Sequence, residues 1–422
     1  MQSVAAALLL SLVNIHYVCI ESFCFYLFLL MLSTTTSTEI DYACVHLNDS
    51  WVVNGYSNVY QTQANIYRIS IDYDNNLVVV FSHGIPDYDR YFTTQDITFL
   101  NSRPKISTDF RSQSKTTAAA GVLVQFGDDI GYDTSGCNMG YWPPGPVCAE
   151  EQTGEDAITS FTLLPAEEDS TSGCYIGNGA QGLLVNGAAL FGWSDTNSYK
   201  NEGIWHQTAI SFEFYDFDVC NGHAAMGLYH HHTYPPCLAE KLNDTGQGHS
   251  PVYGWIKDGF PIYGPYQSAN TLAESCWKKR DYSSSSSTGC GVSNERSCIY
   301  NDPLDISQGT KTASNGPLTT DTVTSLSSNT FTAVSGFYYE DYYYDSACGS
   351  SGGQYLNEYN GHDHDDLGFH YHFTIDTSSN PVFPYSMGVK FYGCITDDCF
   401  TDIPDRRRLD AVDDSSSSPL GC

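Results

Sequence analysis

Positive charge is scarce in this chain. Its 422 residues include 18 Lys+Arg against 49 Asp+Glu, a net charge of −31. A surface of that sign repels phosphate backbones and anionic lipid headgroups, so the charge disfavours nucleic acid as a partner and electrostatic docking to membranes. The acidity does not indicate disorder, because 41% of the residues are apolar and 14% are aromatic. Acidic disordered chains have few aromatics, so we expect a folded protein.

Closely paired cysteines are also absent. None of the 15 cysteines lies in a Cys-x-x-Cys pair, the spacing typical of redox motifs and zinc ribbons. Cys19 and Cys24 lie in the apolar N-terminus and Cys422 in the polar tail, which leaves twelve dispersed cysteines. Dispersed cysteines indicate disulfide bonds and an oxidising compartment. Cys220 and Cys237 flank a histidine cluster, and we expect them to form one bridge that stabilises the fold by about 3 kcal/mol.

Long apolar runs are confined to the N-terminus, at residues 4–13 and 23–32. Glu21 lies between them, and burying it in a membrane would cost about 2.5 kcal/mol or more. A cleaved signal peptide at 1–34 is therefore favoured over a signal anchor, although no Lys or Arg precedes the first run and no Ala-x-Ala site follows. We expect a secreted or cell-surface protein with no stable membrane span after cleavage.

Stretches rich in Ala, Leu and Lys are scarce, while Tyr, Val, Thr, Gly and Ser are abundant, which favours β structure over helix. Apolar or alternating runs predict short strands at 65–71, 77–81, 121–126, 182–187 and 209–217. A short helix is expected at 272–278. The Ser/Thr-rich segments 283–287 and 307–335 are typical of solvated loops. The Tyr- and acid-rich segment 338–344 is expected to be an edge strand or loop, with a ligand-facing aromatic surface as the alternative.

Histidine is not abundant, but its placement is informative. Two clusters share an Asn-Gly-His turn, then a glycine, then an aromatic residue followed by His-x-His. The histidines they share are His223, His230 and His232 in the first cluster and His362, His370 and His372 in the second. The two clusters are therefore an internal repeat. His364 lies among acidic residues and is typical of a solvated loop.

The spacing of the repeat suits metal binding. In a strand, residues i and i+2 point to the same face about 6.6 Å apart, so two imidazoles can converge on one ion. The Asn-Gly turn can bring the third histidine back over the strand. His231 and Tyr371, between the paired histidines, are expected to point away. Imidazole ligands suit Zn or Cu without choosing between them, and we expect both repeats to meet at one His-rich site.

Three further residues are candidates for this site. Asp258 lies in an Asp-Gly turn and could bind metal, orient a ligand histidine or only cap the turn. His249 is a weaker candidate for a fourth ligand. In an enzyme, Asp258 or Glu358 would act as the base for metal-bound water. No serine-nucleophile, HExxH or paired-carboxylate motif supports a particular reaction, so the sequence does not decide whether the protein is an enzyme.

Several motifs occur in the order of a known family. They are Cys220-Asn-Gly-His, Tyr229-His-His-His, His249-Ser-Pro, Asp258-Gly-Phe-Pro-Ile-Tyr-Gly-Pro and Phe369-His-Tyr-His. Together they resemble the YHYH domain family, over roughly residues 83–394. Gly84-Ile-Pro86, Val185-Asn-Gly187, Phe383-Pro-Tyr385 and Gly393-Cys394 also look like family positions. The resemblance implies an exported domain and no particular reaction.

These patterns combine into one expectation for the fold and two for the function. Residues 35–400 are expected to form a single mainly β domain, a disulfide-bonded β-sandwich or barrel-like fold with two pseudo-repeats and long loops, followed by a flexible polar tail at 401–422. The favoured function is binding of a transition metal outside the cell. The alternative is a structural or glycan-contacting cell-surface protein whose histidines and tyrosines are core packing. Sequons at Asn48 and Asn243 permit glycosylation of an exported chain.

We predict that the mature protein is exported and oxidised. Protein isolated from its own cells should lack residues 1–32 and contain few free thiols, because the apolar N-terminus and the dispersed cysteines both indicate the secretory route. N-terminal sequencing and thiol titration measure the two properties. Retention of residues 1–32 together with mostly free thiols would contradict the prediction.

Overall fold

The computed structural model covers most of the chain after its N-terminus. It describes residues 66–72, 75–103, 109–111, 115–133, 149–163, 165–167, 173–364, 367–393, 395, 400 and 403. All of them belong to one compact unit, Ser50–Cys422. The expected signal peptide at 1–34, the sequon at Asn48 and, apart from residue 403, the tail at 401–422 lie outside the described residues.

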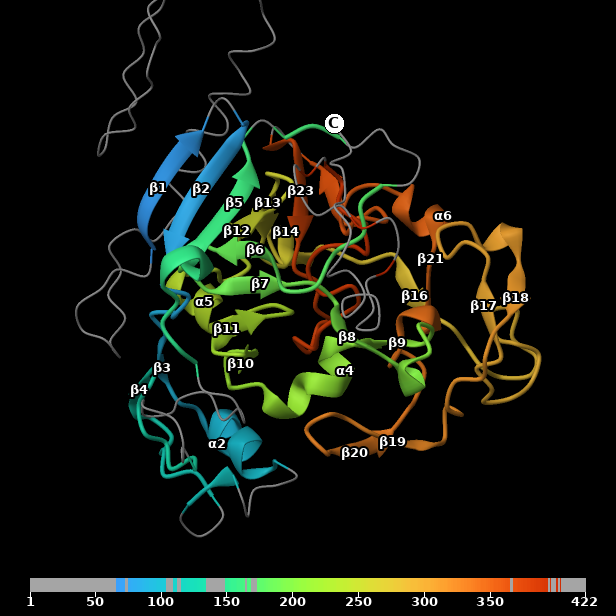
Figure 1. Ribbon diagram of the computed structural model, residues 1–422, viewed down its shortest axis with the longest axis horizontal. Coiled ribbons are helices and arrows are strands. Elements are labelled where there is room, and N and C mark those ends of the chain that lie inside the picture. Colours follow the sequence, from blue (N-terminus) through green and yellow to red (C-terminus); the bar gives the residue numbers. More distant parts are fainter. Residues whose placement is uncertain are drawn as a thin grey trace, which may run out of the picture. The chain divides into compact units, whose positions relative to one another are not determined.

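The central element is an eight-stranded sheet (Figure 1). Its strands, in spatial order, are β10 (Gly222–Ala225), β11 (Leu228–His231), β7 (Ala189–Phe191), β6 (Ala180–Leu184), β12 (Val252–Ile256), β13 (Pro261–Tyr263), β23 (Phe369–His372) and β22 (Gly361–Asp363). The ladder starts at β10 and ends at β22, so this sheet is open and does not close into a barrel. The prediction of a mainly β fold is confirmed, and the barrel-like alternative is not what these strands form.

The sheet consists of two halves with the same pairing pattern. In the first half, β6 and β7 form an antiparallel hairpin, β7 pairs in parallel with β11, and β11 pairs antiparallel with β10. In the second half, β12 and β13, then β23, then β22 repeat that order with the same directions. The antiparallel pair β6–β12 joins the halves. The two pseudo-repeats predicted from the histidine clusters are thus the two halves of the sheet.

The strand order separates the two histidine clusters. The first lies on β10 and β11 at one end of the sheet, and the second on β22 and β23 at the other, with β7, β6, β12 and β13 between them (Figure 1). Five strand spacings of about 4.8 Å place the clusters about 24 Å apart along the sheet. The expectation of one shared His-rich site is therefore wrong, and each cluster is a site of its own.

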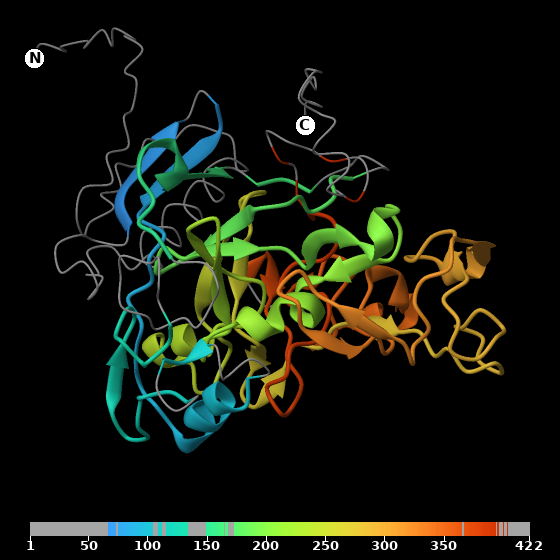
Figure 2. The same ribbon diagram turned by 60° about the horizontal axis from the view of Figure 1, so that its bottom comes forward.

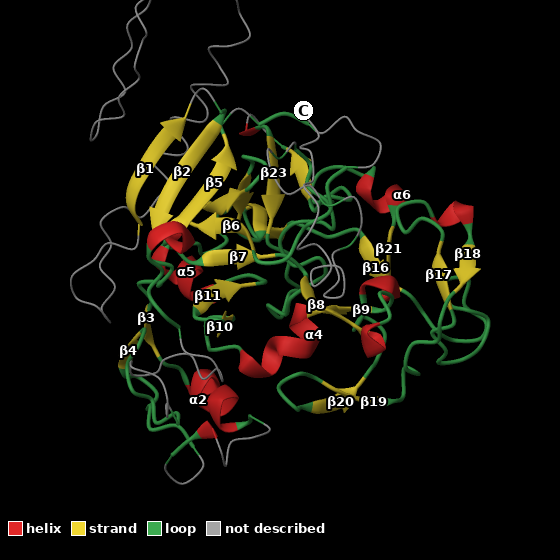
Figure 3. Ribbon diagram, viewed as in Figure 1, coloured by secondary structure: helices red, strands yellow, loops and turns green. Residues whose placement is uncertain are grey.

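Smaller sheets and short helices surround the large sheet (Figure 3). One sheet has three strands, β1 (Ile66–Asp72), β2 (Leu77–Ser82) and β5 (Ile158–Thr162). The other strands form two-stranded sheets. Three of these are β3 (Asp89–Tyr91) with β4 (Leu123–Gln125), β8 (Ser194–Ser198) with β9 (His206–Thr208) and β14 (Tyr266–Ser268) with β15 (Thr271–Leu272), and three more are β16 (Trp277–Lys279) with β21 (Tyr342–Tyr344), β17 (Cys298–Tyr300) with β18 (Thr310–Thr312) and β19 (Thr322–Thr324) with β20 (Thr330–Thr332). The helices are α2 (Thr94–Asn101), α4 (Ala209–Glu213), α5 (Pro236–Lys241) and α6 (Ser346–Gly349), and the 3-10 turns are η1 (Gly154–Ala157), η2 (Tyr199–Asn201), η3 (Phe214–Asp216), η4 (Ile306–Gln308) and η5 (Tyr339–Asp341).

The two halves differ in the connection that crosses from the hairpin to the second strand pair. In the first half this connection carries β8, β9 and α4, whereas in the second it runs from β13 to β22 and carries β14 through β21. Both Ser/Thr-rich segments expected as loops belong to this longer connection. Residues 283–287 are a loop of turns and bends, as expected. Residues 307–335 instead contain β18, which pairs with β17, and the hairpin β19–β20. In both views the yellow-to-orange β17–β18 region lies on the side away from β1 and β2 (Figures 1 and 2).

Two local predictions were wrong, and a third was wrong in part. Residues 209–217 form α4 and η3 instead of a strand, because the buried pair Ala209 and Phe212 has helical spacing. Residues 272–278 form no helix; Trp277 begins a strand that pairs with β21 and packs against Tyr344. The run 121–126 does form the predicted strand, β4, but not the buried strand that its apolar residues indicated, because Leu123 is exposed. Tertiary packing decides the conformation of such short segments more than local pattern does.

The prediction of disulfide bonds is confirmed for the described part of the chain. Bridges join Cys220 to Cys237, Cys276 to Cys348, and Cys290 to Cys298. The first of these fixes α5 to the Asn-Gly-His turn that precedes β10, with the two Cα atoms 5.2 Å apart. None of the helices in the described ranges is long and apolar enough to cross a membrane.

A buried ionic network holds the segment against which α4 packs. Asp341 accepts hydrogen bonds from Arg296 Nε and Nη2, from the Tyr282 hydroxyl and from the backbone N–H of Tyr338. Arg296 and Asp341 are both fully buried. The ring of Tyr338 in turn packs 5.5 Å from that of Phe212 in α4. The network therefore positions the helix whose last residue is Glu213.

We expect Asp341→Ala to destabilise the fold by about 3–5 kcal/mol, because it leaves the guanidinium of Arg296 buried without its counter-ion. Denaturant unfolding measures the loss. Asp305→Ala is the matched control, since Asp305 is an exposed carboxylate that only caps a 3-10 turn in the same connection. Equal unfolding midpoints for the two variants would contradict this account of the network.

Candidate functional site

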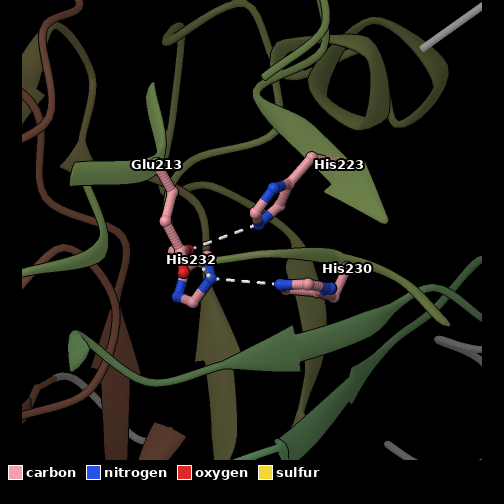
Figure 4. A group of neighbouring side chains, drawn as sticks. All are labelled: Glu213, His223, His230 and His232. Carbon is pink, nitrogen blue, oxygen red and sulfur yellow. Dashed lines mark hydrogen bonds and ion pairs between the residues drawn. The ribbon is translucent and has the colours of Figure 1, made fainter. Parts of the chain in front are cut away.

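Four side chains converge at the first cluster (Figure 4). His223 lies on β10 directly opposite His230 on β11, His232 follows β11, and Glu213 ends α4. One donor atom from each of the four lies within 4.8 Å of the others. The three histidines are at most 5% exposed. The Glu213 side chain is partly exposed, but its Oε2, which faces the histidines, is buried.

Cross-strand pairing and strand periodicity produce this convergence. His223 and His230 are cross-strand neighbours, and His232 is two residues beyond His230. The centroid of the His230 ring lies 4.4 Å from that of His223 and 4.9 Å from that of His232. The preceding Asn221 adopts a positive φ of 61°, a conformation that Asn tolerates well. The Asn-Gly-His turn thus brings the third imidazole over the strand.

Backbone carbonyls fix which ring nitrogen carries the proton. His230 Nδ1 lies 3.0 Å from the Leu228 carbonyl oxygen, and His232 Nδ1 lies 2.7 Å from that of Gly192. A carbonyl only accepts hydrogen bonds, so Nδ1 of each ring donates and Nε2 is left as an acceptor. The same arrangement orients most histidines that bind metals.

The acceptor atoms face one another. Nε2 of His230 lies 3.1 Å from Nε2 of His232, and Oε2 of Glu213 lies 3.0 Å from Nε2 of His232 and 3.5 Å from Nε2 of His223. Nε2 of His223 is buried and makes no hydrogen bond. Buried acceptors at this separation repel one another unless a cation lies between them, either a metal ion or an additional proton.

Burial favours the neutral form of two of these imidazoles, those of His223 and His230. It lowers the pKa of His223 to about 4, and it lowers the pKa of His230 well below its ordinary value. Burial would raise the pKa of Glu213, but the neighbouring His232 and His223 outweigh it, so this pKa is lowered. A neutral imidazole and an ionised carboxylate are the forms that bind metals. His223 and His230 therefore present their ligand atoms without prior loss of a proton near neutral pH.

The second cluster repeats the geometry of the paired histidines. His370 Nδ1 lies 2.7 Å from the Gly368 carbonyl oxygen and His372 Nδ1 lies 2.6 Å from that of Gly264. Gly264 occupies the same place after the β12–β13 hairpin that Gly192 occupies after β6–β7. His362 lies opposite His370, as His223 lies opposite His230. Donor atoms of His249, His370 and His372 lie within 4.8 Å of one another, as do those of His362, His364 and His370.

The fourth donor is not repeated. Glu213 has no counterpart in the two groups of the second cluster, whose potential ligands are all histidines. His249, expected only as a weaker candidate, lies in one of these groups. The reading of His364 as part of a solvated acidic loop is wrong, since its half-buried ring stacks 5.1 Å from that of His362.

The residues between the paired histidines point to the opposite face of the sheet. His231 Nε2 lies 2.9 Å from the Tyr88 hydroxyl, and the Tyr371 hydroxyl donates to Asp258 Oδ2. Asp258 also accepts from the backbone N–H of Phe260, so it caps its turn and contacts no histidine of either group. Glu358 is likewise outside both groups, and its backbone oxygen accepts from Trp277 Nε1.

Glu213 is the residue that the sequence analysis missed. The alternation in 209–217 assigned Ser211, Glu213 and Tyr215 to the polar face of a strand, where a glutamate needs no explanation. A signal was present in the Phe-Glu-Phe context, which puts a carboxylate within an otherwise apolar segment. Only the helical conformation, fixed by Phe212 against Phe331 and Phe337, directs Glu213 to the histidines.

Comparison with known proteins identifies one family. A family model described as YHYH protein matches residues 160–381, just over half of the chain. The matched range contains the whole eight-stranded sheet and both histidine clusters. The similarity expected at Gly84-Ile-Pro86, Phe383-Pro-Tyr385 and Gly393-Cys394 lies outside it. No curated protein and no solved structure matches the chain.

The buried Asp258 makes the stability of the protein dependent on pH. Burial raises its pKa to about 6, above the value of about 3.9 expected when unfolded, so the folded state binds the proton more tightly. Its contribution is fully present below pH 4 and is lost as the pH rises through 6, an effect of about 3 kcal/mol. Urea unfolding from pH 4 to 8 should show this decline in the parent protein and a smaller one in Asp258→Asn. A decline of equal size in both proteins would contradict it.

Proposed function

The chain belongs to the YHYH protein family, and on this premise we propose that it is an exported protein that binds one transition-metal ion at the first cluster. The ligands are Nε2 of His223, His230 and His232 and the carboxylate of Glu213. Zinc is the first candidate ion, and copper(II) is the other ion that three imidazoles and one carboxylate suit.

One observation supports this proposal above all others. The buried acceptors of His230, His232 and Glu213 face one another at 3.0–3.1 Å, and backbone carbonyls already hold the Nδ1 protons of both rings. A divalent ion converts this repulsion into four favourable bonds. In zinc sites the bonds to imidazole nitrogen are about 2.0–2.1 Å, so small rotations of the side chains would complete a tetrahedron.

The ligand set favours an ion that is held in place over one that activates water. Four protein ligands fill a tetrahedral shell, which is the pattern of structural zinc sites, whereas catalytic sites keep one position open. Since the unfolded chain has no preformed site, binding at this cluster adds its free energy to folding. The ion would link α4 directly to β10 and β11. Along the chain, α4 is connected to β10 through η3 and the turn before β10.

Export rests on the disulfides and on the surface of the described chain. Three bridges are typical of an oxidising compartment. The sequon asparagine Asn243 lies just after α5 and is exposed, so its side chain is accessible to glycosylation. The alternative of a glycan-contacting surface finds less support, because Tyr338, Tyr339, Tyr342 and Tyr344 are buried.

His232→Ala should remove about one metal ion per chain, because the variant loses a ligand that contacts both Glu213 and His230. Elemental analysis of purified, tag-free protein, with a thermal melt before and after chelation, measures the effect. His206→Gln is the matched control, since His206 is a buried histidine paired with Glu340 at 2.7 Å but lies outside the cluster.

The control should keep the metal content of the parent protein. The rival explanation, an imidazolium paired with Glu213, predicts that His232→Ala changes stability but not metal content. Equal metal content in the parent and in His232→Ala would overturn the proposal.

A further inference from the structure

We propose that the second cluster is a separate, mononuclear metal centre in which His249, His370 and His372 bind one ion through Nε2 and leave a fourth position open to a small anion. This inference goes beyond the proposed function, which concerns the first cluster, and it depends only on residues of the second. The geometry favours zinc or copper(II), the ions that all-imidazole ligand sets suit.

The three imidazoles form a nearly regular triangle. The ring of His249 has its centroid 5.3 Å from that of His370 and 5.3 Å from that of His372, and the last two are 5.0 Å apart. His249 comes from the segment between α5 and β12, so two distant parts of the chain meet here. His249 thus adds a corner from a different element to the two paired histidines. The ring of His362, the counterpart of His223, lies 4.9 Å from that of His370 and 5.0 Å from that of His372.

Each of the three rings has its Nδ1 against a backbone carbonyl. The distances are 2.7 Å from His249 to Ser250, 2.7 Å from His370 to Gly368 and 2.6 Å from His372 to Gly264. Nε2 is therefore the acceptor atom in all three. His370 and His372 are fully buried, and the Nε2 atom of each makes no hydrogen bond. Buried acceptors without a donor are the feature that a cation satisfies.

The second cluster holds one ion and not two. Two groups of histidines have donor atoms that lie within 4.8 Å of one another. One group is His249, His370 and His372, and the other is His362, His364 and His370. Both groups therefore require His370. Because Nδ1 of His370 donates to Gly368, only its Nε2 lone pair is left, and one lone pair binds one ion. The first group contains two buried histidines and the second contains one, so the first group offers the more rigid ligands.

The charge of the donors indicates what fills the fourth position. The first cluster includes the carboxylate of Glu213, whereas the second group contains only neutral imidazoles. A divalent ion held by three neutral ligands keeps its full +2 charge, which favours a negatively charged fourth ligand. Three protein ligands plus an exchangeable one is the pattern of open metal sites. His249 as a whole is partly exposed although its Nε2 is buried, so the small anion would reach the ion past the exposed part of this residue.

Cobalt(II) is a suitable probe, because its visible absorption reports coordination. The experiment uses His232→Ala, in which the first cluster lacks a ligand. This protein should bind one cobalt ion per chain, and azide should change its spectrum in a saturable manner. Adding His249→Ala should abolish cobalt binding. Adding His364→Gln, which alters a neighbouring histidine outside the proposed group, should leave it unchanged.

Each contrary result overturns a defined part of the inference. Loss of cobalt with His364→Gln but not with His249→Ala would assign the ion to the other group of histidines. A spectrum that azide does not change would show a closed shell, and two cobalt ions per chain in His232→Ala would contradict a mononuclear centre. The unsubstituted protein gives a test without any variant: two cobalt ions should bind, and azide should perturb only one of them.

The same measurements separate this inference from the proposed function. If the parent protein binds a single cobalt ion that azide perturbs, and His232→Ala leaves that number unchanged, the first cluster is empty and the second stands. If His232→Ala binds no cobalt at all, the second centre is refuted while the first remains.

Discussion

The hydrogen bond from a histidine Nδ1 to a backbone carbonyl is the interaction on which both candidate centres depend. In each half of the sheet, the second histidine of the pair donates to a glycine that follows a hairpin, His232 to Gly192 and His372 to Gly264. These glycines are required by close packing: a Cβ on Gly192 would lie 2.4 Å from Ile176, and one on Gly264 would lie 2.5 Å from Tyr253. The carbonyl can approach the imidazole only because no side chain holds the backbone away, and the ring then presents Nε2 to its neighbours.

The repeated sheet supplies the same histidine geometry twice, and the connections around it supply the difference. The first half adds the carboxylate of Glu213 from a helix, and the second adds His249 from the segment before β12. A scaffold of paired strands therefore supports two donor sets of different charge at its two ends. The opposite face of the sheet also differs between the two halves. In the second half, Tyr371 lies between the paired histidines and carries a hydroxyl group itself. In the first half, His231 takes that position, and the hydroxyl group beside it comes from Tyr88. The paired strands and their backbone carbonyls are the same in both halves. The additional donor, Glu213 or His249, determines the charge of each site.

Local patterns predicted the features that depend on neighbours in the chain. The His-x-His spacing fixed which imidazoles share a face, since strand periodicity alone decides it, and the Asn-Gly turns indicated the third histidine. The separation of the clusters could not be predicted, because it follows from the parallel pairs β7–β11 and β13–β23, which join segments remote in sequence. Glu213 was missed for the same reason: the packing of Phe212 against Phe331, more than a hundred residues later, makes its segment a helix. Predictions failed wherever contacts remote in sequence outweighed the local pattern.

An anomalous-diffraction experiment on crystals grown with zinc tests the central claim most directly. The account predicts an anomalous peak at the first cluster, about 2.0–2.2 Å from Nε2 of His223, His230 and His232 and from an oxygen of Glu213. Nδ1 of His230 and His232 should keep the carbonyl contacts that they make in the present structure. Absence of a peak there, with His232 instead donating a proton directly to Glu213, would contradict the claim and leave the cluster as a buried ion pair.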